Sequence, residues 1–277
     1  MNEQIIKKSL LTIILMSTPL LLADNIEKKA HQRATISEAQ KEAIIEDSDF
    51  VMPSAGALAN SLKMIFGDIQ WSQFIDIKRK AIAKTDREKA LNLGIEGADL
   101  FFLAISQDVD NLTKVSISTN RILDRIIIKN KSINTNDRKR KLKKLRDLIK
   151  AEKWKIVLRE ISSLKEEINS DFRAKDREDL ALLNDIGGWL EGYRLTVEAM
   201  NSNYKGAESM ILLQAPLISY LLKELQSSQK LKTFSKRGKL IDTLVSINSL
   251  LSKAKNFHLS KDEVSQLSNI FGGKIKL

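Results

Sequence analysis

Histidine and cysteine, two side chains widely used for catalysis and metal binding, are almost absent from this chain. It contains 2 histidines, His31 and His258, and no cysteine. Histidine is the usual acid or base near neutral pH, and both residue types are common zinc ligands. A Ser–His–Asp triad would have to use one of these histidines, and the Gly-x-Ser-x-Gly elbow of many hydrolases does not occur. We therefore expect a non-enzymatic protein with no metal and no cofactor.

Two long apolar segments carry narrow stripes of polar residues. Asn92, Glu96 and Asp99 recur at a spacing that places them on one helix face. A second, similar stripe begins at Asn184. Stripes that face solvent need no explanation, whereas stripes that face each other would bury carboxylates that must pair with a cation. The second arrangement predicts a polar small-ligand pocket inside a helical bundle, lined by Asn92, Glu96, Asp99, Asn184, Glu191 and Arg194.

The same two segments contain glycines three or four residues apart, which places each pair on one helix face. The pairs are Gly94 with Gly97 and Gly188 with Gly192. Glycine inside a helix costs about 1 kcal/mol relative to alanine, so its presence requires compensation. Close packing of a neighbouring helix is the favoured explanation, and a ligand resting on bare backbone is the alternative.

Positive charge is concentrated in one part of the chain. The formal net charge is +11. Residues 121–155 hold 14 lysines and arginines against 4 acidic residues, so this segment carries almost the whole excess. An apolar helix face formed by Leu142, Leu145 and Ile149 is surrounded by basic residues. The candidate anion-binding residues are Arg138, Lys139, Arg140, Lys141, Lys143, Lys144, Arg146 and Lys150.

The N-terminus has the pattern of a secretory signal over residues 1–23. Lys7 and Lys8 precede an apolar run that is too short to span a bilayer, and Ala23 is a small residue suited to cleavage. An uncleaved anchor is the alternative. Residues 24–53 are polar and are expected to form a largely irregular tether. The sequence thus favours a periplasmic or secreted protein.

Helical periodicity dominates from residue 54 onward, and no strand pattern is evident. We expect one all-α domain over residues 54–277, a multi-helix bundle or stack of helical hairpins with nine or ten helices. An internal duplication is a further hypothesis. The hypothesis of a duplication comes from a repeated tripeptide, Asp86-Arg87-Glu88 and Asp176-Arg177-Glu178. The expected helices are 54–66, 70–84, 85–106, 108–129, 137–150, 154–169, 176–200, one kinked at Pro216, 236–255 and 261–271.

These patterns favour an exported binding or adaptor protein whose basic helix docks an anionic surface or partner. The expected partner is an anionic membrane, an envelope polymer or an acidic protein, and export argues against nucleic acid. A basic helix that merely keeps the protein soluble remains an alternative. The second functional hypothesis is a helical-bundle receptor with its pocket between the two glycine-containing helices. The oligomeric state is not indicated by the sequence.

Overall fold

The computed structural model describes residues 55–77, 83–127, 135–254 and 257–272. The predicted signal at 1–23 and the tether at 24–53 lie outside these residues. The chain divides into two units, Met1–Leu58 and Ala59–Leu277. Only the first residues of one helix are described in the first unit.

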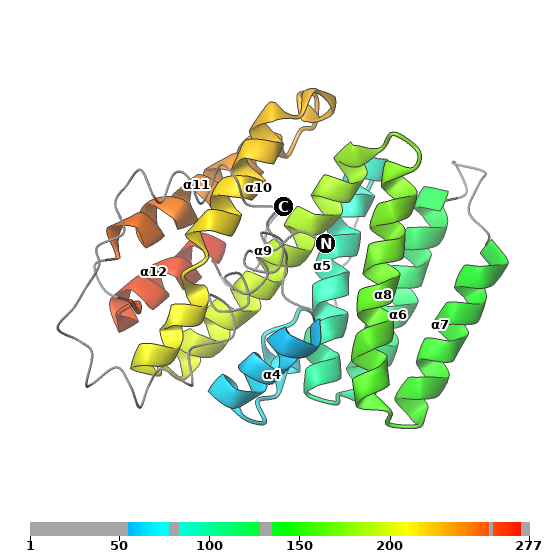
Figure 1. Cartoon of the computed structure of the whole chain (residues 1–277), viewed down its shortest axis with the longest axis horizontal. Helices are drawn as coiled ribbons and strands as arrows, with labels where there is room; N and C mark the ends of the chain where they lie inside the picture. Colours follow the sequence, from blue (N-terminus) through cyan, green and yellow to red (C-terminus); the bar gives the residue numbers. More distant parts are fainter. Residues whose placement is uncertain (1–54, 78–82, 128–134, 255–256, 273–277) are drawn as a thin grey trace, which may run out of the picture. The chain divides into compact units, whose positions relative to one another are not determined.

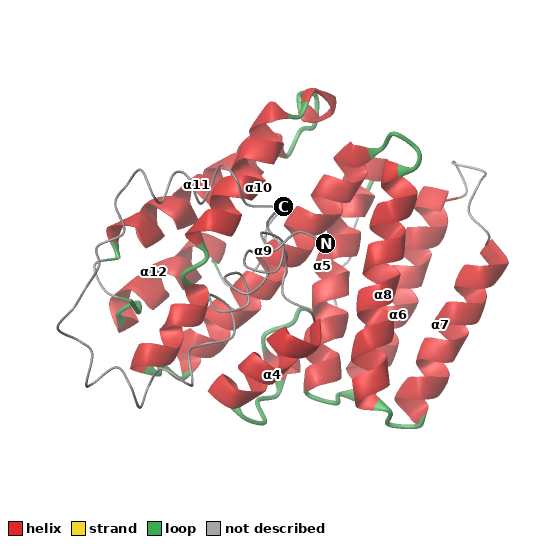
Figure 2. Ribbon diagram, viewed as in Figure 1, coloured by secondary structure: helices red, strands yellow, loops and turns green. Residues whose placement is uncertain are grey.

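The described residues form helices and no strand, so the predicted all-α, multi-helix architecture is confirmed (Figures 1 and 2). Nine α-helices occur within them, joined by turns and short 3-10 helices. Their bounds are α4 Ala55–Phe66, α5 Asp86–Ile105, α6 Val109–Ile127, α7 Thr135–Lys150, α8 Trp154–Arg173, α9 Glu178–Ser202, α10 Ala215–Ser227, α11 Arg237–Lys253 and α12 Lys261–Phe271.

Helices α5 and α9 form the centre of the unit and make the most extensive contacts of any helix pair. Both are buried around most of their circumference, as their apolar sequences predict. Arg87 contacts Asp179 near the start of the two helices, and Phe102 lies beside Gly192 further along. Residue numbers therefore rise together, which shows that α5 and α9 run in the same direction.

The remaining helices pack around this pair in chain order. Helix α6 packs on α5, α7 on α6 and α8, and α8 on both central helices. Helix α12 packs on α9, while α10 and α11 form a hairpin. Helix α7 makes its main helix contacts with α6 and α8 alone and lies at the edge of this group (Figure 1).

Helix ends follow local sequence rules. Capping boxes at Thr85/Glu88 and Ser260/Glu263 begin α5 and α12, each with both reciprocal hydrogen bonds. Gly272 ends α12 with a φ of 56°, a left-handed conformation that glycine adopts without a Cβ penalty. These signals are local, which is why the sequence places these boundaries well.

The predicted helix over residues 70–84 is wrong in its described part. Trp71–Gln73 form one 3-10 turn, and residues 74–77 are not helical. Trp71 is 1% exposed and its ring lies 4.6 Å from that of Phe102 and 5.5 Å from that of Phe66. Burial of this large ring between α4 and α5 dictates the path of the segment, overriding its helical periodicity.

Two further helix predictions need correction. Pro216 does not kink a helix, because it lies in the first turn of α10, where a missing N–H costs nothing. The residues before it form a separate 3-10 helix, Gly206–Leu212. Helix α8 continues to Arg173, one turn beyond the predicted end at residue 169.

We predict that Trp71→Ala lowers the free energy of unfolding by about 3–5 kcal/mol, because it removes the ring that anchors residues 71–77. Phe257 is the matched control, since its ring is 78% exposed. Phe257→Ala should change stability by less than about 0.5 kcal/mol. Urea unfolding followed by circular dichroism measures both effects. Equal effects of the two substitutions would contradict the claim that the Trp71 ring anchors residues 71–77.

Candidate functional site

The crossing of α5 and α9 is a direct backbone contact. A Cβ built on Gly94 would lie 2.0 Å from the carbonyl oxygen of Asn184. A Cβ on Gly187 would lie 2.2 Å from the carbonyl oxygen of Leu91, so the contact is reciprocal. The Cβ position of Gly188 lies 3.3 Å from the Gly94 carbonyl oxygen. Backbone therefore fills the space at which a ligand resting on these glycines was envisaged.

The other two predicted packing glycines behave differently. Among the described residues, no atom from outside the local helix backbone lies within 4 Å of a Cβ built on Gly97, and at Gly192 the nearest such atom is a ring carbon of Phe102 at 3.5 Å. Close backbone approach thus explains Gly94 and Gly188 but does not require glycine at Gly97. Gly187, which the prediction omitted, makes one of the two tightest approaches. Spacing on a helix face cannot show which glycine points at the neighbouring axis.

Most polar residues of the two predicted stripes are buried. Glu96, Asp99, Asn184, Glu191 and Arg194 are buried, and Asn92 is partly exposed. Buried polar groups need partners within the protein, and the hydrogen bonds of Glu96, Asn184 and Arg194 lead to different parts of the fold. The Ser118 hydroxyl of α6 donates to Glu96 at 2.7 Å, so this carboxylate is directed to α6.

Glu191 and Arg194 form a buried ion pair one turn apart on α9. The Arg194 guanidinium donates to both carboxylate oxygens of Glu191, with Nε–Oε2 2.9 Å and Nη2–Oε1 2.6 Å. It also donates to the Phe74 carbonyl at 3.0 Å, which ties the segment after Trp71 to the core. Burial of both charges is tolerated because the pairing is bidentate.

Asn184 faces a third helix. Its amide donates to the Asn169 side chain of α8 at 2.8 Å, and Asn169 donates to Asp185 at 2.8 Å. Asp185 also pairs with Lys165 and Arg173 of α8. Glu96, Asn184 and Arg194 therefore contact α6, α8 and the residue 71–77 segment respectively, and these contacts do not unite them around one space.

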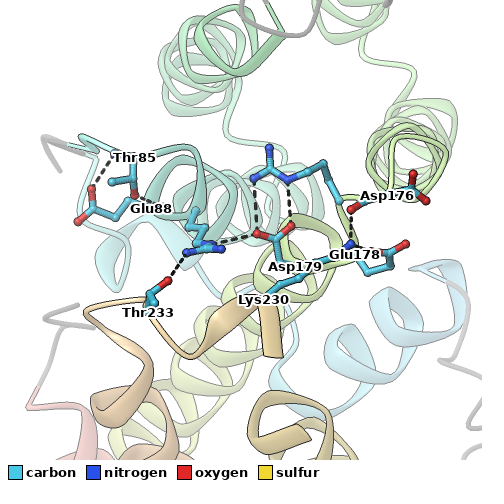
Figure 3. Close-up of polar contacts among 9 residues, drawn as sticks. Thr85, Glu88, Asp176, Glu178, Asp179, Lys230 and Thr233 are labelled. Carbon is cyan, nitrogen blue, oxygen red and sulfur yellow. Dashed lines mark hydrogen bonds and ion pairs between the residues drawn. The ribbon is translucent and has the colours of Figure 1, made fainter. Parts of the chain in front are cut away.

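A polar cluster at the N-terminal ends of α5 and α9 was not predicted as a site (Figure 3). Asp179 is buried and accepts hydrogen bonds from Arg87 and Arg177, each with an Nε–oxygen distance of 3.0 Å. Arg87 also donates to Thr233 at 3.1 Å. Both arginines belong to the Asp-Arg-Glu tripeptide that is repeated in the sequence. That repeat was a signal for the cluster, but only the parallel α5/α9 crossing brings its copies together.

The cluster also holds the segment that joins α10 to α11. Lys230 donates to the Asp176 carbonyl and to the Glu178 carboxylate, and Lys236 lies 3.7 Å from Glu88. The hydrogen bond from Lys230 holds the pKa of Glu178 below its usual range. Burial would raise the pKa of Asp179, but hydrogen bonds and charge from Arg177 and Arg87 outweigh this and lower it.

Helix α7 turns its apolar face inward. Leu145 and Ile149 are buried. Two of the predicted basic residues form ion pairs with α8: Lys141 with Glu167, and Lys144 with Glu160 at 2.9 Å. These pairs partly neutralise the side of α7 next to α8, so they attach the helix to the bundle as well as contributing to its charge.

The opposite side of α7 remains charged and accessible. We define the cationic surface by its exposed basic residues, which are Arg140, Lys143, Arg146, Lys150 and Lys153. An open hollow of about 490 Å³ lies on it, lined by Arg140, Lys143, Lys144, Asp147, Leu148, Ala151 and Lys153. The side chains of Arg138 and Lys139 lie outside the described residues. The arrangement offers several point charges to one anionic partner.

Two further properties concern the described part of the chain. Within it, no helix is both long enough and apolar enough to cross a membrane. The same residues include no group of three or more His, Asp or Glu side chains placed to hold a metal ion. Comparisons with protein-family models, curated proteins and solved structures found no match to this chain. Functional inference therefore rests on the geometry.

We predict that Gly94→Ala lowers the free energy of unfolding by more than about 3 kcal/mol, because the new Cβ meets backbone that cannot move aside. Gly97→Ala on the same helix is the matched control and should stabilise by up to about 1 kcal/mol through helix propensity. Thermal and urea unfolding measure both. Wild-type stability of the Gly94→Ala protein would refute the backbone contact.

We predict that protonation of Asp179 at low pH lowers the free energy of unfolding. Its folded-state pKa lies below the unfolded value of about 3.9, so the unfolded chain binds more protons as the pH falls. The contribution of Asp179 to the free energy of unfolding is complete above about pH 5. It is lost as the pH falls through the pKa of the unfolded state and then through that of the folded state. Asp179→Asn should destabilise the protein at pH 7 and flatten the pH profile between about 5 and 3.

The control for this profile is Asp242→Asn, which changes an exposed carboxylate on α11. Urea midpoints measured across the pH range should change little in that variant. A profile for Asp179→Asn that runs parallel to the wild-type profile would show that Asp179 is not the acid-sensitive group.

Proposed function

We propose that this chain is an exported, non-enzymatic binding or adaptor protein that docks an anionic surface or partner through the cationic surface of α7. The observation that carries the proposal is the division of α7 into an inward apolar face and an outward basic one. The inward face attaches the helix to α6 and α8, and the outward face is left for a partner. Charge of this kind accelerates and orients association with an opposite charge.

The distribution of ion pairs supports this proposal over a general role in solubility. Lys141 and Lys144 are matched to acidic residues of α8, whereas no ion pair is found among the described residues for Lys143, Arg146, Lys150 or Lys153. Basic residues that serve solubility alone need not gather on one helix. Here they share an edge helix, where an extended partner can reach several of them at once.

The alternative of a small-ligand receptor has less support. Its pocket would lie between α5 and α9, where the backbones touch at Gly94 and Gly187. The polar groups expected to line it engage Ser118, Asn169 and the Phe74 carbonyl instead. If the chain is exported, anionic lipids, envelope polymers and acidic proteins are the partners that the cationic surface would meet.

We predict that the double variant Lys143→Glu/Lys150→Glu elutes from immobilised heparin at a clearly lower salt concentration than the wild type. Each lost cation removes a contact whose counterions are released on binding. Lys232→Glu/Lys239→Glu is the matched control, because it reverses two exposed lysines elsewhere and changes net charge equally. Coincident elution of the two variants would mean that only net charge matters, which would overturn the proposal.

A further inference from the structure

The cationic surface is elongated along the α7 axis. Lys143 follows Arg140 by 3 residues and precedes Lys150 by 7 residues. This spacing places the three on one side of the helix, with Arg146 on the flank. At 1.5 Å rise per residue, the row from Arg140 to Lys150 is about 15 Å long. Lys153 extends it at the turn into α8. A row of point charges is matched best by a chain that lies along it.

A bilayer is a poorer match to this surface. Stable association of a basic helix with a membrane usually combines charge with insertion of apolar side chains. On α7 the described apolar side chains do not supply such an anchor, because Leu145 and Ile149 are buried against neighbouring helices and Leu148 is half-buried. Asp147 and Glu152 are exposed beside the basic residues and oppose a uniformly negative plane. A flexible chain can direct its anions to the lysines and away from these carboxylates.

The composition of α7 also separates two kinds of linear polyanion. Proteins that bind single-stranded nucleic acid add aromatic side chains on which the bases stack. The sequence of α7, TNDRKRKLKKLRDLIK, contains no aromatic residue. Phosphate groups suit both basic residue types of the cationic surface. Their several acceptor oxygens can bind the forked arginine guanidinium and the point charge of lysine.

We propose that the cationic surface binds a linear phosphate polymer without bases, laid along α7 from Arg140 to Lys153. This inference rests on the proposed function and names its ligand class. The hollow, whose lining runs from Arg140 to Lys153, receives phosphate groups along the row. Asp147 opposes binding there, so its neutralisation strengthens the interaction.

The test measures binding of the full chain to four probes over a series of salt concentrations. The probes are long-chain inorganic polyphosphate, phosphatidylglycerol vesicles, oligothymidylate and poly-glutamate. Polyphosphate is expected to bind most tightly. Lys143→Glu/Lys150→Glu should weaken that binding at least about tenfold and lower the log–log salt slope by about 2. Asp147→Asn should strengthen it about two- to fivefold, and Lys232→Glu/Lys239→Glu should change it much less.

The outcomes separate this inference from the proposed function. Tighter or equal binding to vesicles, oligothymidylate or poly-glutamate, still sensitive to Lys143 and Lys150, overturns the phosphate polymer and leaves anionic docking in place. Failure to bind any probe overturns both. An equal loss of binding in the control variant Lys232→Glu/Lys239→Glu also overturns both proposals. Circular dichroism of each variant verifies that the fold is retained.

Discussion

The arrangement of this protein depends on the backbone contact between α5 and α9. Gly94 and Gly187 each face a carbonyl oxygen of the other helix at a distance that leaves no room for a Cβ. Glycine disfavours a helix, so the gain from packing two axes this closely must offset that cost. The contact fixes the register of the pair. As a consequence, the N-terminal ends of both helices meet, and Arg87 and Arg177 reach the same carboxylate of Asp179.

The same register divides polar residues between the interior and the surface. Glu96 is directed to α6, Asn184 to α8, and Arg194 to Glu191 and the Phe74 carbonyl. Each of these side chains has a hydrogen-bond partner within the protein, which favours a structural role over ligand binding. Exposed basic residues are concentrated instead on the outward side of α7. A closely packed interior thus supports an edge helix whose basic residues we propose as the docking surface.

Local signals made much of this fold predictable. Capping boxes at Thr85 and Ser260 define helix starts, and the nearly all-apolar segments around Gly94 and Gly188 identify the central helices. Errors arose where tertiary contacts decide. Burial of Trp71 against Phe102 prevents the expected helix, and helix-face spacing did not show that Glu96 faces α6. The basic residues of α7 were visible in the sequence, but pairing of Lys141 and Lys144 with α8 required the structure.

The central claim, that α5 and α9 form the rigid centre of the bundle, is tested most directly by native-state hydrogen exchange. Amides in the middle of these two helices should exchange most slowly, with opening free energies that equal the global free energy of unfolding. Amides of the edge helix α7 should open at lower free energy, because it packs mainly on α6 and α8. Faster exchange around Gly94 and Gly187 than in α7 would contradict the account.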